Sequence, residues 1–269
     1  MFRSVLPKTL RDLRRGFLYW SLGITALVAL HIGVYPSVRD NPALNELAES
    51  YPEAIKGFIG FGGELDWVSA PGYLGAELYS FVVPLLLLIV AIGAGSGALA
   101  GEEERGTLEL LLSLPVSRVR VALEKLAALV AEVVGLALVL LAALWIGVTA
   151  IDMNVSGAHL AAATLSAVLL AIGFGAIALA AGAATGKRSI AIAVSSAGAV
   201  AAYVVNSLAP LVSELEPVQR ISPFYFYSAS DPLRRGLDLV YVLALVGIVV
   251  AAGIAALVAA ERRDLAAQA

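Results

Sequence analysis

Six long apolar runs, separated by short or charged connections, dominate the pattern of this chain. They cover roughly residues 17–35, 77–100, 126–150, 159–184, 190–212 and 238–260. Each run is about 19 to 26 residues long, which matches a helix that crosses a bilayer with some tilt. None has the polar face that a soluble helical core needs, and the alternation typical of strands is scarce. The pattern therefore predicts an all-α membrane protein with six transmembrane helices in a single domain over residues 1–269.

The segment before the first run has an apolar stripe and a basic face. Its apolar positions recur at spacings of three or four residues: Phe2, Leu6, Leu10, Leu13 and Phe17. Lys and Arg side chains fill the other face. This pattern predicts an amphipathic helix in the membrane interface, with a plain basic flank as the alternative.

Two long segments, 36–76 and 213–237, connect the first run to the second and the fifth to the sixth. In the former, apolar residues at helical spacing from Leu44 to Phe58 predict an amphipathic helix near the headgroups, or alternatively a substrate lid. The sequences GFGGELDW and APGY are expected to end that helix, and the acids through Asp66 to be solvated. In the latter, Pro223 and Pro232 predict short broken helices. The aromatic run 224–227 suits a belt at the outer interface.

Glycines and one acid stand out within the runs. The second run ends in closely spaced glycines from Gly93 to Gly101, which favour close helix packing, or alternatively a hinge. Glu132 lies one to two turns inside the third run. Because an ionised group at that depth is costly, we expect it to pair with Lys125 or with a basic group of a neighbouring helix.

Composition excludes several classes of protein. Hydrophobic residues make up 60% of the chain and charged residues only 14%, against about 25% charged in soluble domains. Cysteine is absent, which excludes disulfides and thiolate metal sites, and the only two histidines fall in different runs. The formal net charge of −3 argues against nucleic-acid binding. We expect no cleavable signal peptide, because a small-residue cleavage site is missing after the first run.

The distribution of Lys and Arg predicts the orientation. With both termini cytoplasmic, 13 of the 18 basic residues fall on the inside and five on the outside. The outer five lie in the two long connections. The positive-inside rule therefore places both termini, residues 101–125 and Lys187 in the cytoplasm.

The charged connection 101–125 carries the most specific pattern in the chain. Glu102, Glu103 and Glu104 precede Arg105, and Gly106 and Thr107 open a leucine-dense stretch that Pro115 ends. Thr107 is a candidate N-cap, and an acid in the first turn, Glu109, is favoured by the helix dipole. The result is a short apolar helix over 107–114, too short to cross a bilayer. Such a helix suits docking onto a partner; the alternative is a helix that merely covers the bundle.

This segment, GEEERGTLELLLSLPVSR, resembles the signature of the ABC type 2 transporter permeases, the membrane subunits of export-type ATP-binding-cassette systems. The resemblance is specific only here, and extends over the rest of the chain in outline. It implies that the loop forms a coupling helix received by a separate ATPase subunit. The implied coupling residues are Glu102, Glu103, Glu104, Arg105, Gly106, Thr107, Leu108, Glu109, Leu111, Leu112 and Pro115.

The resemblance also implies the composition of the working complex. Six spans form half of a pathway, so two permease chains, identical or homologous, and two ABC ATPase subunits are expected in a prokaryotic inner membrane. No cofactor is expected in this chain, because ATP and Mg²⁺ would be bound by the ATPase. The substrate pathway is expected between the two permeases, lined by spans one, two and five.

Other chemistry is poorly supported. GAATGKRS at 182–189 lacks the glycine spacing of a phosphate loop, and Arg188 follows its lysine. A serine protease at Ser96 would need a base within reach, but both histidines are expected near the opposite membrane face. Two rivals remain: a structural subunit of an ATP-coupled complex that moves no cargo, and an ATP-independent transporter. The latter normally has charged groups at mid-membrane, which these runs lack.

Overall fold

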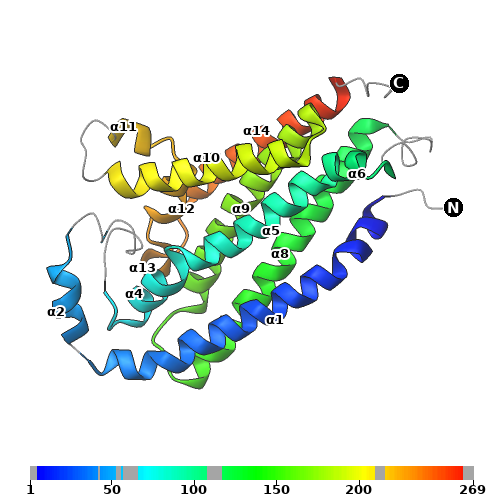
Figure 1. The fold of residues 1–269 in the computed structure, drawn as a ribbon. Coiled ribbons are helices and arrows are strands. Elements are labelled where there is room, and N and C mark those ends of the chain that lie inside the picture. The colour runs from blue at the N-terminus through cyan, green and yellow to red at the C-terminus, as the bar shows by residue number, and fades with distance from the viewer. Residues whose placement is uncertain are drawn as a thin grey trace.

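The computed structural model describes residues 5–41, 43–52, 56, 66–107, 117–209 and 216–262. Across these ranges the chain is helical and contains no strand, which confirms the predicted fold class. Six helices are long and apolar enough to cross a membrane, and they form one bundle (Figure 1). They are α1 (Leu6–Arg39), a second span built from α4 (Ala70–Leu74), η1 (Gly75–Tyr79) and α5 (Val82–Ala98), then α8 (Arg118–Ala150), α9 (Gly157–Thr185), α10 (Arg188–Leu208) and α14 (Leu239–Arg262).

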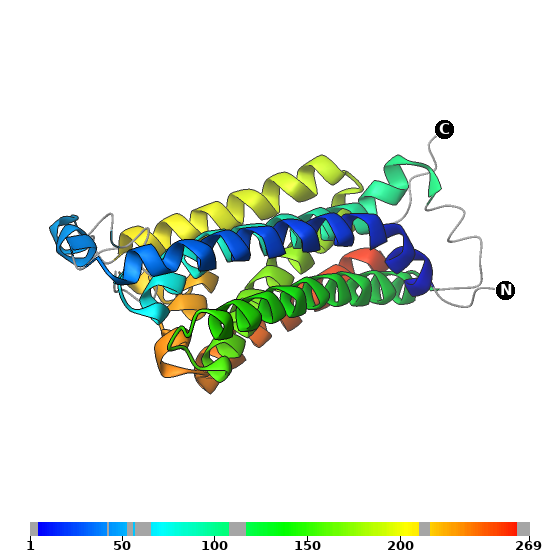
Figure 2. The ribbon, with the colours of Figure 1, turned by 90° about the horizontal axis from the view of Figure 1, so that it is seen from below.

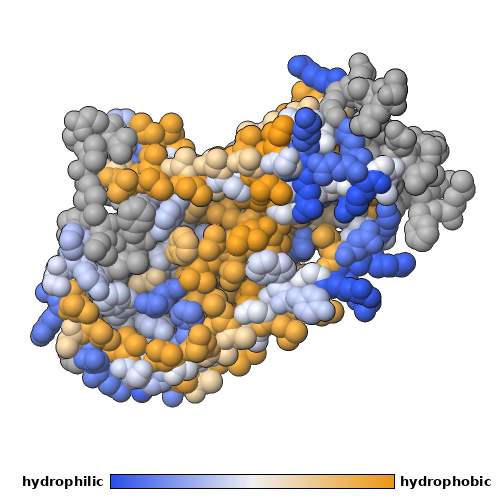
Figure 3. Space-filling model, viewed as in Figure 1, coloured by the Kyte–Doolittle hydropathy of each residue, from blue (hydrophilic) through white to orange (hydrophobic). Residues whose placement is uncertain are grey.

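The two ends of the bundle differ. The chain termini and the short helix α6 (Ala100–Glu104) lie at one end, called the terminal end below. The other, the distal end, holds α2 (Ala43–Ser50), α4, α11 (Glu216–Gln219), α12 (Pro223–Ser228) and α13 (Pro232–Arg235) (Figures 1 and 2). Apolar side chains cover the middle of the face seen in Figure 3, and hydrophilic ones gather at the terminal end.

Helix α9 forms the centre of the bundle. It packs against α5, α8, α10 and α14, whereas α1 packs mainly on α8. The closest approach joins Gly95 of α5 to Gly175 of α9: a Cβ at Gly95 would lie 2.1 Å from the Gly175 carbonyl oxygen. Backbone contact of this kind is possible only between small residues. The packing role predicted for the glycines is thus confirmed at Gly95.

Helix α1 is longer than the apolar run that predicted it. It continues for 34 residues and includes Pro36. Its first turns, dark blue in Figure 2, bend toward the start of α8, where Val5 joins a buried cluster with Val121 and Ala122. The amphipathic segment is therefore the first part of α1, without an intervening break, and its place in the membrane interface stays a prediction.

The second span is interrupted near the distal end. Its π-helical turn η1 is followed by a turn at Ser80 and Phe81 before α5 begins. Pro84 has no amide hydrogen to donate to the Ser80 carbonyl, which favours a break at this point. The APGY sequence, expected to end a helix, instead opens α4, with Pro71 in its first turn. Proline is tolerated there because first-turn amides have no acceptor within the helix.

Two expectations about the connections are corrected at the distal end. Asp66 is not simply solvated: it accepts hydrogen bonds from the amides of Val68 and Ser69 and forms an ion pair of 3.1 Å with Arg234. The aromatic run does not lie wholly in a lipid-facing belt, because Phe224 and Tyr227 are buried in the protein core. The short helices predicted around the prolines are confirmed as α12 and α13, each of which opens with a proline.

Tyr227 links α12 to the interrupted span. Its hydroxyl donates a 2.5 Å hydrogen bond to the carbonyl oxygen of Tyr79. The side-chain hydroxyl of Tyr79 shares a separate 2.7 Å hydrogen bond with the hydroxyl of Thr164 on α9. Burial raises the pKa of the Tyr227 hydroxyl well above its usual range, so this group remains a neutral donor. Side chains of η1, α9 and α12 are therefore linked to one another at the distal end.

Candidate functional site

The acidic segment that precedes the predicted coupling helix is anchored in the bundle. After α5 ends, Leu99 departs from regular helix geometry and α6 carries the three glutamates. Glu102 is buried, Glu103 is half-buried and Glu104 is exposed. Exposure thus increases along the three glutamates: Glu102 packs against the helices, and Glu103 and Glu104 lie closer to the solvent at the end of the bundle.

Glu102 forms a buried ion pair with Lys125 of α8. Its Oε1 atom contacts Lys125 Nζ, and the two residues are only 6% and 5% exposed. The second carboxylate oxygen, Oε2, is buried without a hydrogen-bond partner among the described residues. The pair fixes α6 to α8, and because it is buried its loss is costly.

Glu104 connects the same segment to α10. Its Oε1 atom accepts a 2.8 Å hydrogen bond from the backbone amide of Arg188, the first residue of α10. Gly186 makes the tight turn from α9 in a left-handed conformation, with φ of 67°. The sequence GAATGKRS thus contains the turn between α9 and α10.

Helix α8 is tied to α1 by a further acid. Glu124 Oε2 accepts hydrogen bonds from the amides of Val5 and Leu6, the latter at 3.0 Å. An anion at this position satisfies otherwise unpaired amides at the start of α1. Glu124 also pairs with Arg120 at 3.1 Å. The acidic segment is therefore connected directly to α8 and to the start of α10. It is connected to the start of α1 indirectly, through Glu124 of α8.

The last described residues of the segment set its exit direction. Arg105 ends α6, and Gly106 has φ of +68°, a conformation that favours glycine. The Thr107 hydroxyl donates a 3.1 Å hydrogen bond to the carbonyl oxygen of Glu102. The predicted residues Leu108, Glu109, Leu111, Leu112 and Pro115 lie outside the described residues, so the coupling helix itself and its N-cap stay predictions.

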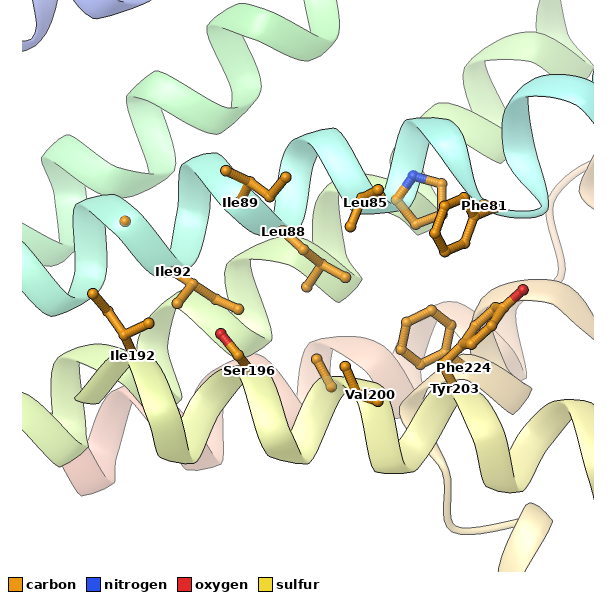
Figure 4. Close-up of a pocket in the computed structure, with 13 residues that line it drawn as sticks. Phe81, Leu85, Leu88, Ile89, Ile92, Ile192, Ser196, Val200, Tyr203 and Phe224 are labelled. Atoms are coloured by element: carbon orange, nitrogen blue, oxygen red, sulfur yellow. The ribbon is translucent and has the colours of Figure 1, made fainter. Parts of the chain in front are cut away.

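An apolar groove runs between α5 and α10 (Figure 4). It has a volume of about 510 Å³. Leu85, Leu88 and Ile92 project into it from α5, and Ser196 and Tyr203 face them from α10. Phe224 of α12 closes its distal end, where it packs edge-on against Tyr203 at a centroid distance of 5.4 Å. Two of the spans predicted to line a pathway therefore line this groove.

Comparison with known protein families agrees with the helix pattern and with the family resemblance noted in the sequence. The family model described as ABC-2 family transporter protein matches residues 5–265. The chain belongs to the ABC-2 transporter family. A search of curated proteins found no match. As a member of this family with six apolar helices, the chain is a multi-pass membrane protein and the membrane domain of a transporter.

Two basic residues of this ABC-2 protein were not assigned to the site from the sequence. Lys125 was expected to pair with Glu132 and Arg188 was interpreted only as part of a cytoplasmic turn, yet the Lys125 side chain pairs with Glu102 and the Arg188 backbone amide donates to Glu104. The expected pairing of Glu132 with Lys125 is wrong, because Lys125 pairs with Glu102 instead. Glu132 is 7% exposed, and its Oε2 atom has no hydrogen-bond partner in the described part of the chain. One signal in the sequence could have indicated the Glu102–Lys125 pair. Glu102 closely follows the second apolar run and Lys125 directly precedes the third.

The serine and histidines considered for a protease serve structural roles. Ser96 is fully buried, and its hydroxyl donates to the Gly93 carbonyl at 3.1 Å. His31 Nδ1 lies 2.9 Å from the Leu27 carbonyl oxygen, and His159 Nδ1 lies 3.0 Å from that of Leu233. Among the described residues no histidine contacts Ser96, so nothing there activates it as a nucleophile.

Proposed function

We propose that this chain is the permease subunit of an ATP-driven exporter and forms half of its substrate pathway. Two such chains, identical or homologous, would assemble with two ATPase subunits that bind ATP and Mg²⁺. The terminal end would face the cytoplasm of a prokaryotic cell, and the distal end would lie outside the inner membrane. Residues 102–109, Leu111, Leu112 and Pro115 would receive the ATPase.

The anchoring of the acidic segment is the observation that carries this proposal. Glu102 holds the segment to α8 through a buried ion pair, and Glu104 holds it to the start of α10. Glu124 then connects α8 to the start of α1. A displacement of the loop by a closing ATPase dimer would therefore act on α8 and α10 directly and on α1 through α8. Such connections supply the physical contacts that coupling between distant sites requires.

The α5–α10 groove supports a pathway on this face of the bundle. Its walls are almost entirely apolar, and α1 and α10 leave most of their apolar side chains uncovered. A second permease placed against this face would close the groove from the bilayer. Closed grooves with apolar walls suit lipophilic or amphipathic cargo.

The coupling hypothesis is tested by co-purification with the partner ATPase and by transport-dependent ATP hydrolysis in liposomes. Leu111→Asp with Leu112→Asp would place charges on a docking face, which costs several kcal/mol and should abolish association. Glu104→Ala should reduce coupling by releasing α10. Glu261→Ala, an acid near the end of α14 that lies outside the site, is the matched control and should behave as the unaltered protein. Normal association and coupling in a folded double aspartate variant would refute the assignment.

Orientation and stoichiometry need separate measurements. The chain contains no cysteine, so single-cysteine variants can be labelled without a modified background. Cysteines at exposed Asn154 and Arg220 should react from outside, and one at Lys187 only after permeabilisation. Native mass spectrometry of the active complex should find two permease chains. Labelling of position 187 from outside, or a single permease in the active complex, would contradict the model.

A further inference from the structure

A second cavity adjoins the apolar groove at the terminal end. It has a volume of about 260 Å³ and lies among α1, α5, α6, α8 and α10. Unlike the groove, it is lined by charged side chains: Asp12, Glu102, Arg105, Lys125 and Arg188. Gly93 of α5 lines both spaces. This second cavity is called the charged chamber below. An elongated molecule lying along α5 would therefore contact the apolar groove over most of its length and the charged chamber at the terminal end.

Two guanidinium side chains converge in this chamber. A Cβ placed on Gly101 would lie 3.6 Å from Arg188 Cδ and 3.8 Å from Arg105 Nη2, so both side chains lie against this one glycine. The side chains of Arg105 and Arg188 form no ion pair with any described residue. Both residues are exposed, so solvent screens much of the repulsion between them, and an anion placed between the two guanidiniums would be attracted by both.

The other charges that line the chamber do not fully offset the two guanidiniums. Lys125 and Glu102 neutralise one another through their ion pair. Asp12 of α1 lines the chamber as a single negative charge against the two guanidiniums. The residues that line the chamber therefore carry one positive charge in excess; Glu104, whose carboxylate accepts the hydrogen bond from the Arg188 amide, lies outside this lining. Guanidinium groups bind phosphate in a bidentate geometry, which makes a phosphate ester the best-matched anion.

The length of the groove indicates what is attached to the phosphate. Its α5 wall extends from Phe81 to Gly93, which corresponds to about 18 Å at a rise of about 1.5 Å per residue. The hydrocarbon core of a bilayer is about 30 Å thick, so one leaflet is about 15 Å. The groove is thus as long as an acyl chain that reaches from the headgroups to the bilayer midplane.

We propose that the groove and the chamber form one binding site for a membrane phospholipid. Its phosphate lies between Arg105 and Arg188, and an acyl chain follows α5 toward Phe224. Gly93 forms the passage between the two parts, and the absence of a side chain keeps that passage open. This inference rests on the proposed function, since it names the class of cargo that enters the pathway from the leaflet at the terminal end.

Gly93 offers a test of the passage that does not disturb packing. A Cβ built at Gly93 meets no atom within 4 Å, so Gly93→Val should fold normally while it narrows the junction. Gly247 of α14 also has open space around a built Cβ and lines neither cavity. Gly247→Val is therefore a matched control for the added bulk.

The contribution of the two guanidinium charges can be tested with a control variant at the neighbouring residue. Arg188→Gln, alone and with Arg105→Gln, removes the guanidiniums that line the chamber. Lys187→Gln removes the same charge one residue earlier, from an exposed side chain outside the chamber. Asp12→Asn removes the opposing carboxylate and should strengthen phosphate binding.

The experiment measures lipid retained by the purified permease–ATPase complex after reconstitution with phosphatidylglycerol, phosphatidylethanolamine or a neutral galactolipid. We expect retention of both phospholipids over the galactolipid, and a fall of about tenfold or more in Arg105→Gln/Arg188→Gln, as loss of charge-assisted bonds predicts. Gly93→Val should also lose retention. Lys187→Gln and Gly247→Val should retain lipid as the unaltered complex does, and inorganic phosphate at millimolar concentration should not displace it.

Equal retention of the galactolipid, or retention unchanged in the double arginine variant, would overturn the proposal. Displacement by inorganic phosphate alone would replace it with a soluble-anion site. If the double variant lost ATPase association while retaining lipid, the arginines would belong to the ATPase interface instead. Failure of the exporter assignment is distinguishable, because ATPase association and hydrolysis would then be absent in the unaltered complex while arginine-dependent lipid retention persisted.

Discussion

The buried ion pair between Glu102 and Lys125 allows a quantitative test of how the acidic segment is held. Three variants are needed: Glu102→Gln, Lys125→Met and the two combined. Each single change leaves one charged group buried without its partner, since Glu102 is 6% exposed and Lys125 is 5% exposed. The combined change removes both charges and leaves an uncharged contact of similar volume.

The expected magnitudes differ sharply between single and double variants. Breaking a buried pair from one side costs about 3–5 kcal/mol, whereas replacing both partners is often nearly neutral. The coupling energy between the two sites should therefore amount to at least about 3 kcal/mol, or more than a hundredfold in the ratio of folded to unfolded protein. The unpartnered Glu102 Oε2 already lacks a compensating bond, so the combined variant should lose little.

Reversible unfolding in mixed detergent and denaturing micelles would measure the free energy of unfolding of each variant. Arg120→Gln is the internal standard, because Arg120 forms an i,i+4 pair with Glu124 and its side chain is 55% exposed. That change should cost less than about 0.5 kcal/mol. Additive single effects would refute the reasoning that the pair acts as a buried unit. A double variant as unstable as the worse single variant would contradict the expectation that replacing both partners is nearly neutral.

Three further changes test other contacts. Gly95→Ala should destabilise the protein by about 3 kcal/mol or more, because the new methyl group would meet the Gly175 carbonyl at 2.1 Å; thermal unfolding in detergent measures this. Gly106→Ala should cost about 1–2 kcal/mol through its φ of +68° and reduce ATPase co-purification. Tyr227→Phe should cost about 1 kcal/mol by removing the buried hydrogen bond to the Tyr79 carbonyl, and protease sensitivity of the distal end should increase.

The features that depend on one segment at a time could be predicted from the sequence. The six helices follow from uninterrupted apolar runs, because a backbone in lipid must satisfy its hydrogen bonds internally. Pro223 and Pro232 correctly marked the starts of α12 and α13. Pro36 gave no comparable signal: α1 continues through it, since one missing amide does not end a helix supported by packing on both sides.

The features that depend on two segments could not be predicted. Lys125 was within reach of Glu132 along one helix, but the fold brings Glu102 of a different helix to it. Asp66 lies far from Arg234 in sequence, and only the packing of α13 near α4 joins them. Neither hydropathy nor helical spacing encodes which helices become neighbours. The docking residues from Leu108 to Pro115 lie outside the described residues, and their role remains a prediction from the family resemblance.

The contact between Gly95 and Gly175 limits how this bundle can change shape. Where two backbones touch, neither helix can rotate or slide without a clash, so α5 and α9 must move together as one rigid body. The α10 wall of the groove has more freedom, because it meets α5 across side chains and open space. Any widening of the groove should therefore come from a displacement of α10, with α5 as the stationary wall. Spin labels on α5 and α9 should keep a fixed separation through the ATP cycle, while the separation between α5 and α10 changes.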